Sequence, residues 1–160
     1  MSAAGAPAAP PSGYVHDESL WPVSVTMIPA RALDAEIVEH MRYVDGLYAR
    51  GEPFLTVTFI SLRTRITSGQ RAMMSRWMND TQAQMEALNK GAVFITGSTM
   101  FRFVLSGLML LSPLPIPYEV FSEADAAAPW LRRKLAENEL EAPFDLATGL
   151  RRLERRFQAG

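Results

Sequence analysis

Strand-like and helix-like segments alternate along most of this chain, and this alternation constrains the fold more than any other feature of the sequence. Short segments rich in β-branched and aromatic residues are each followed by a segment with the apolar spacing of an amphipathic helix. Four strands are predicted, at residues 21–28, 54–61, 92–96 and 118–121. Because alternating strands and helices build α/β domains, we expect a small, mostly parallel or mixed sheet of four to five strands flanked by helices.

The predicted helices have recognisable ends. Asp34 is a favourable N-cap for the helix after the first strand, and Gly51 is a favourable C-cap. The helix after the second strand is predicted from residue 67 or 68 to about residue 90. Polar residues at 79–81 interrupt its apolar pattern, which predicts a bend or a split. Further helices are predicted after each of the two remaining strands.

Two segments are predicted to lie outside the α/β domain, which spans residues 21–137. Residues 1–20 consist mainly of Ala, Pro, Gly and Ser, a composition that buries too little apolar surface to offset the entropy of ordering. We therefore expect a disordered N-terminal tail, and it lacks the pattern of a secretory signal. Residues 138–160 are expected to form a linker and an additional C-terminal amphipathic helix.

Composition excludes several classes of function. The chain of 160 residues contains no cysteine, which excludes disulfides, thiolate metal sites and cysteine nucleophiles. Its formal net charge of −1 provides no overall field toward nucleic acid or anionic membranes. The longest apolar run, residues 103–111, is far below the roughly 20 residues of a membrane span. We therefore expect a cytoplasmic protein without a transmembrane segment.

No set of residues in the sequence amounts to a catalytic site. The two histidines, His16 and His40, are expected in the N-terminal tail and on a helix surface. The segment Gly97-Ser98-Thr99 lacks the lysine and the further glycines of a phosphate-binding loop. We therefore predict a protein that is not an enzyme and that uses no metal or cofactor.

The turn between the second predicted strand and its helix is the main candidate for a functional site. Ligands and partners of alternating strand–helix folds usually meet the chain at such junctions. Helix N-termini attract anions, and arginines add bidentate hydrogen bonds to phosphate or carboxylate. The alternative is that a hydroxyl only caps the helix and the arginines are solvated. The candidate residues for binding a partner or an anion are Arg63, Arg65, Thr67, Ser68, Gly69, Arg71 and Arg76.

The order of elements, together with Thr67-Ser68-Gly69 at the start of this helix, resembles the STAS-like domains, the sulfate-transporter and anti-sigma-factor-antagonist family, in a diverged bacterial form. The resemblance covers roughly residues 21–137. In that family an aspartate followed by Ser/Thr-Ser-Gly opens the helix, and a partner kinase phosphorylates the first hydroxyl. The resemblance therefore implies phosphorylation at Thr67, with Ser68 as a second candidate. This chain differs in having Ile66 in place of the aspartate, and only one strand is predicted before the first helix, where the family has a hairpin.

The predicted C-terminal helix has a narrow apolar stripe and an opposite face rich in arginine. Three roles are open: docking on its own domain, self-association into a dimer, or binding to an anionic surface. The arginines are not interleaved with aromatic residues, so the signal for nucleic-acid binding is weak. The candidate residues for self-association are Leu146, Leu150, Leu153 and Phe157.

These patterns predict a regulatory signalling protein that binds another protein. It is expected to act as a non-enzymatic interaction module and to present the Arg63–Arg76 edge to its partner. One alternative is a domain that binds a small ligand or lipid, because residues 101–111 are strongly apolar. Another is a structural subunit that forms homo-oligomers through the C-terminal helix.

Overall fold

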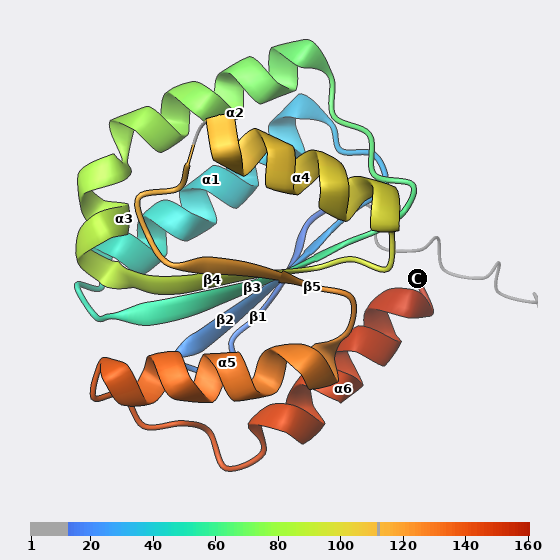
Figure 1. Cartoon of the computed structure of the whole chain (residues 1–160). Coiled ribbons are helices and arrows are strands. Elements are labelled where there is room, and N and C mark those ends of the chain that lie inside the picture. Colours follow the sequence, from blue (N-terminus) through green and yellow to red (C-terminus); the bar gives the residue numbers. More distant parts are fainter. Residues whose placement is uncertain (1–12, 112) are drawn as a thin grey trace, which may run out of the picture.

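The computed structural model describes residues 13–111 and 113–160 of the chain and has three layers. A five-stranded sheet forms the middle layer, and helices cover both of its faces (Figure 1). This arrangement confirms the predicted α/β fold class. Residues 1–12, which belong to the segment predicted as a disordered tail, lie outside the described residues.

The strands follow one another across the sheet in chain order, with β1 at one edge and β5 at the other. β1 is antiparallel to β2, and all the other neighbours are parallel. The sheet is therefore mixed, within the predicted range of strand numbers. The strands are β1 (Val15–Asp17), β2 (Val23–Ile28), β3 (Phe54–Ile60), β4 (Asn89–Ile95) and β5 (Tyr118–Phe121).

Strand β1 lies inside the segment predicted as a tail, so the predicted tail boundary at residue 20 is wrong. Its three residues pair with Val25–Met27 of β2, and Leu20 in the following turn is fully buried. A strand of three residues is too short for its alternation to be recognised in a sequence. It provides the N-terminal hairpin that the sequence analysis did not predict.

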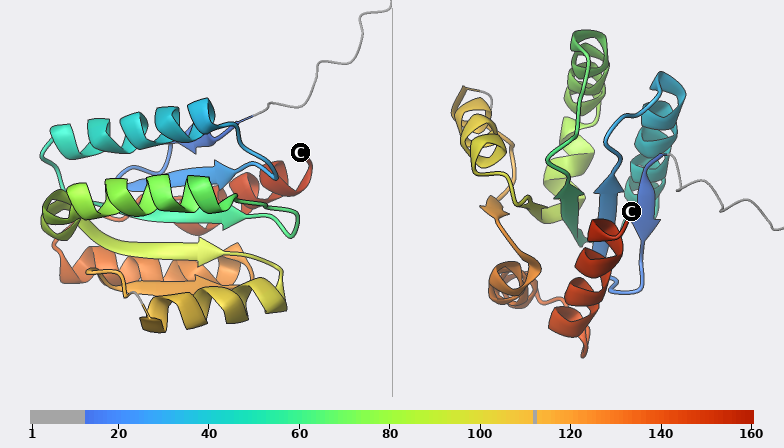
Figure 2. Two further views of the ribbon diagram at one scale, coloured as in Figure 1. Left: turned by 90° about the horizontal axis from the view of Figure 1, so that it is seen from above. Right: turned by 90° about the vertical axis from the view of Figure 1, so that its right-hand side faces the viewer.

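The six helices of the described residues are divided between the two faces of the sheet. Helices α1 to α4 lie on one face, and α5 and α6 lie on the other (Figures 1 and 2). Right-handed crossovers that step in one direction across a parallel sheet place their helices on the same face, as α1 to α4 do. The helices are α1 (Asp34–Ala49), α2 (Ser68–Asp80), α3 (Gln82–Leu88), α4 (Thr99–Leu111), α5 (Ala124–Glu137) and α6 (Leu146–Gln158).

The predicted helix ends are largely reproduced. The interruption at residues 79–81 is confirmed, because α2 ends at Asp80 and α3 begins at Gln82. Gly51 adopts a positive φ of 68°, typical of a helix stop, but it follows the C-cap, which is Arg50. Asp34, however, is the first residue of α1 rather than its N-cap, which is Leu33.

Helix α6 is part of the domain, so the predicted boundary at residue 137 does not delimit the folded unit. Its apolar stripe covers the face of the sheet that the crossover helices leave open and joins the core with α5. Of the three roles considered for this helix, docking on its own domain is therefore the observed one. The residues predicted to mediate self-association are buried within this chain: Leu146, Leu150 and Leu153 are at most 2% exposed, and Phe157 packs on Phe59 with ring centroids 5.6 Å apart.

The turn before β2 and helix α6 approach each other closely at one glycine. Gly149 is buried, and a Cβ atom at this position would collide with the side chain of Leu20. Leu20 itself has no exposed surface. The absence of a side chain at Gly149 therefore lets α6 lie against the N-terminal hairpin.

Candidate functional site

The loops after β2 and β3 lie side by side at the edge where the parallel strands end. The N–H of Arg65 donates a hydrogen bond of 2.8 Å to the carbonyl of Ala30, and an isolated parallel bridge pairs Arg31 with Arg65. In open α/β sheets this carboxyl edge is where ligands usually bind. We call the surface formed by residues 30–33 and 61–71 the carboxyl edge.

A reciprocal pair of hydrogen bonds fixes the start of α2. Thr67 is the N-cap: its Oγ1 accepts a bond of 3.1 Å from the N–H of Gln70, and Gln70 Oε1 accepts one of 3.1 Å from the N–H of Thr67. The amide of Gln70 also donates to the carbonyl of Ala32 (2.9 Å) and to Asp34 Oδ1 (3.0 Å). Gln70 is buried, so this network ties the first turn of α2 to the first turn of α1.

The carboxyl edge is positively charged. The guanidinium-bearing side chains of Arg31, Arg63, Arg65 and Arg71 are exposed, and none forms an ion pair within residues 13–111 and 113–160. The first turn of α2 contains no acidic residue, and its first N–H groups have no partner inside the helix. An anion could therefore be bound here both by arginines and by the N-terminus of α2.

The structure brings together most of the predicted site but not all of it. Arg76 follows Arg71 by five residues, which places it about 140° around the helix and roughly 7.5 Å further along its axis. It therefore does not belong to the carboxyl edge. Arg31 and Gln70 also belong to this edge, although the sequence patterns did not single them out. Arg31 could have been found, because it follows a neighbouring parallel strand at the same edge.

A hollow of about 480 Å³ adjoins this edge on the side of Arg63. Phe59, Ile95 and Phe157 contribute apolar surface to it, and Thr96 and Ser122 contribute hydroxyl groups. Ser61, Leu62 and Arg63 belong both to the hollow and to the carboxyl edge. Part of a partner that contacts the arginines could therefore enter this hollow.

Replacement of Thr67 by alanine is expected to lower the free energy of unfolding by about 1 kcal/mol, because the N-cap acceptor of Gln70 N–H is lost. Denaturant unfolding monitored by circular dichroism measures this change. Ser68→Ala is the matched control, because Ser68 is the exposed first residue of α2 and does not cap it. Equal stability of the two variants would show that the cap contributes nothing.

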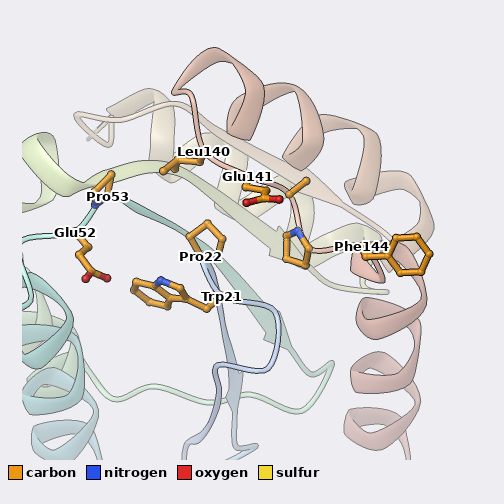
Figure 3. A pocket seen from close by; sticks show the side chains of 9 residues that line it. Trp21, Pro22, Glu52, Pro53, Leu140, Glu141 and Phe144 are labelled. Atoms are coloured by element: carbon orange, nitrogen blue, oxygen red, sulfur yellow. The ribbon is translucent and has the colours of Figure 1, made fainter.

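A larger hollow of about 550 Å³ lies at the opposite edge of the sheet (Figure 3). Its lining combines Trp21, Pro22 and Pro53 with residues 140–144, and its two ionisable groups are Glu52 and Glu141. The ring of Phe144 points away from it into solvent. Among the described residues its lining includes no arginine, lysine or histidine, although the guanidinium of Arg50 lies 4.9 Å from the centroid of the Trp21 ring.

The two histidines occupy a position that the sequence analysis did not predict. His16 on β1 and His40 on α1 belong to a stack of four nearly parallel rings with Tyr14 and Tyr43. Ring centroids are 4.4 Å apart for Tyr14 and His40, 5.1 Å for His16 and His40, and 3.8 Å for His16 and Tyr43. The interpretation of these residues as a tail histidine and a surface histidine is therefore wrong.

Burial in this stack changes the ionisation of its members. Desolvation, with a smaller contribution from the nearby His16, lowers the pKa of His40 to about 4. Desolvation also lowers the pKa of His16, and it raises the pKa of Tyr14 and Tyr43. The Nδ1 atom of His40 is buried without a hydrogen-bond partner in the described part of the chain. The stack is therefore neutral at physiological pH.

Two other kinds of site are absent from the described residues. Within residues 13–111 and 113–160, no three His, Cys, Asp or Glu side chains are grouped so that they could hold a metal ion. In the same ranges, no helix has the length and apolarity required to cross a bilayer.

The chain was compared with protein-family models, with curated proteins and with solved structures. No family model matches it, and no curated protein or solved structure shows significant similarity to it.

Proposed function

We propose that this protein is a non-enzymatic, regulatory interaction module that binds another protein through the carboxyl edge. The observation that carries the proposal is a set of exposed arginines beside a helix N-terminus without acidic residues. Arg31, Arg63 and Arg65 lie on two adjacent loops, and Arg71 lies near the start of α2. A complementary partner surface would be acidic or phosphorylated.

The rigidity of the carboxyl edge supports this role. Gln70 connects the start of α2 to Ala32 and Asp34, and Arg65 is bonded through its backbone to Ala30. Backbone positions that are already ordered lose little conformational entropy on binding, so more of the interaction energy remains as affinity.

The resemblance to STAS-like domains supports a regulatory role. The N-terminal hairpin of β1 and β2 agrees with the expectation for that family, and Thr67-Ser68-Gly69 opens α2 directly after β3. Ile66 still occupies the position of the family's aspartate. If the site is phosphorylated, Ser68 is the more available of the two hydroxyls, because Thr67 Oγ1 accepts the capping bond. A phosphate there would lie at a helix N-terminus close to Arg71.

Reversal of charge at two arginines tests the proposal. The full-length protein and its Arg65→Glu/Arg71→Glu variant are immobilised, and proteins retained from native lysate are identified by mass spectrometry. The partner is expected to be lost from this variant, because opposite charges across the interface become like charges. The purified partner should then bind the unmodified protein with an affinity that falls as salt is added.

A second double variant, Arg132→Glu/Arg133→Glu, is the matched control. It makes the same change of charge on α5, where both side chains are exposed on the opposite face of the sheet. It should retain the partner. Retention by both variants, or loss from both, would contradict the assignment of binding to the carboxyl edge.

A further inference from the structure

Helix α4 has an unusually apolar exposed surface. Arg102 is the one charged residue in its thirteen positions. Three of its large apolar side chains are mostly exposed: Met100 at 78%, Phe103 at 81% and Leu110 at 84%. A helix that is apolar on all sides is normally buried, and clustered apolar exposure marks a binding surface.

A groove of about 620 Å³ runs between this helix and β5. Thr99, Phe103, Ser106 and Leu110 line it from α4, and their spacing of four, three and four places them on one side of the helix. Their stripe is about 16 Å long. β5 is the edge strand, so the groove is open along the side of the sheet.

Strand β5 contributes the apolar floor of the groove. Tyr118 and Val120 pair with Ala92 and Phe94 of β4, which belong to the cluster on the face of α1 to α4. Both side chains therefore point toward α4. Glu119 also borders the groove, but the alternation of a strand directs its side chain to the opposite face.

Arg102 gives the groove a positive group with unused hydrogen-bonding capacity. Its Nε atom is buried and has no hydrogen-bond partner within the described residues. In the same part of the chain it forms no ion pair. Because Nε is buried, a carboxylate in the groove would accept hydrogen bonds from the terminal nitrogens of the guanidinium.

We propose that this groove binds a single-chain fatty acid, with its carboxylate on Arg102 and its alkyl chain between α4 and β5. A carboxylate accepts two parallel hydrogen bonds from a guanidinium, and the alkyl chain would cover Phe103 and Leu110. The volume of the groove is within the range of small-molecule sites. This surface is separate from the carboxyl edge, so the two proposals succeed or fail independently.

The test compares a charged and an uncharged probe of equal length. Dodecanoate and dodecan-1-ol are titrated below their solubility and micelle limits into the full-length protein and into Arg102→Gln, and binding is followed by calorimetry. Dodecanoate is expected to bind more tightly than the alcohol to the unmodified protein. Arg102→Gln should weaken dodecanoate about tenfold or more and leave the alcohol within about twofold, because only the contact with the carboxylate is lost.

Two further variants locate the site. Leu110→Gln should weaken both probes, since it removes apolar contact and keeps Arg102. Arg132→Gln on α5 removes an exposed arginine on the other face and should weaken neither. Each methylene removed from the acid should lower affinity about fourfold. Thermal unfolding verifies that each variant is folded.

Three results would overturn the proposal. The first is that dodecanoate does not bind. The second is that Arg102→Gln and the unmodified protein bind it equally. The third is that the protein binds vesicles of anionic phospholipid but not the monomeric acid, which would identify α4 as a membrane-surface contact instead.

Discussion

Leu150→Ala is expected to lower the free energy of unfolding by about 2–5 kcal/mol, the range for removal of a buried leucine side chain. Leu150 has no exposed surface and lies with Leu146 and Leu153 in the core between α6 and the sheet. The cavity left by alanine cannot collapse easily, because α5 and β-strand residues hold the other walls. Urea unfolding followed by circular dichroism measures the change.

The control for this experiment is Arg155→Ala on the exposed side of the same helix. Its effect on stability should stay within about 0.5 kcal/mol. Light scattering on both variants distinguishes docking from self-association. If Leu150→Ala dissociated an oligomer without lowering the stability of the monomer, α6 would be an interface between copies, contrary to the observed packing.

Acidification from about pH 6.5 to pH 4 is expected to destabilise the fold by about 3 kcal/mol through His40 alone. The pKa of His40 is about 4 in the folded protein and about 6.5 in the unfolded chain. Above pH 6.5 the residue is neutral in both states and makes no pH-dependent contribution. Below pH 6.5 the unfolded chain takes up the proton first, so stability falls until the folded protein is also protonated near pH 4.

The charged and titratable groups around His40 lie at β1, which packs against α1, and on α1 itself. His16 lies on β1 and Tyr14 directly precedes this strand, and Tyr43 belongs to the same stack from α1. Glu36, also on α1, raises the pKa of Tyr14. Of these contributions, burial of the imidazole is the largest, and the charge of His16 adds to it.

His40→Phe isolates this contribution, because phenylalanine keeps a stacking ring and cannot be protonated. The free energy of unfolding is measured in urea at half-unit steps of pH for both proteins. The free energies of unfolding of the two proteins should change with pH at the same rate near pH 7. Below pH 6.5 the difference between the two curves should change progressively. Parallel curves down to pH 4 would show that His40 titrates normally, and therefore that the stack does not bury it.

The sequence was most informative where a hydrophobic pattern extends over several turns or a complete strand. β5 has its predicted bounds, and β3 ends one residue before its predicted end at residue 61. The split between α2 and α3 follows from the polar residues at 79–81. β4 begins three residues before its predicted start, because the helix before it ends at Leu88 rather than near residue 90. In the structure Gly91 lies within the strand, where a Cβ would come within 3.0 Å of the Trp130 ring.

The missed features depend on contacts between distant segments. Thr67 and Arg65 could be identified from the strand-to-helix turn, but Gln70 acquires its role only because α1 begins beside it. The ring stack likewise requires the three-residue strand β1 to lie against α1. A local pattern cannot encode such contacts, and the narrow stripe of α6 gave no indication of whether its partner was this chain or another copy.

The close approach of Leu20 to Gly149 also has a consequence for biosynthesis. Ser19 and Arg152, which are 133 positions apart, are hydrogen-bonded beside it, so the N-terminal hairpin is translated well before the helix that covers it. While the ribosome is still completing α6, the face of the sheet that it covers has no partner and exposes apolar side chains. Nascent chains of this length class are prone to aggregate through such surfaces. A chaperone that shields this face until Leu153 emerges would therefore raise the yield of folded protein.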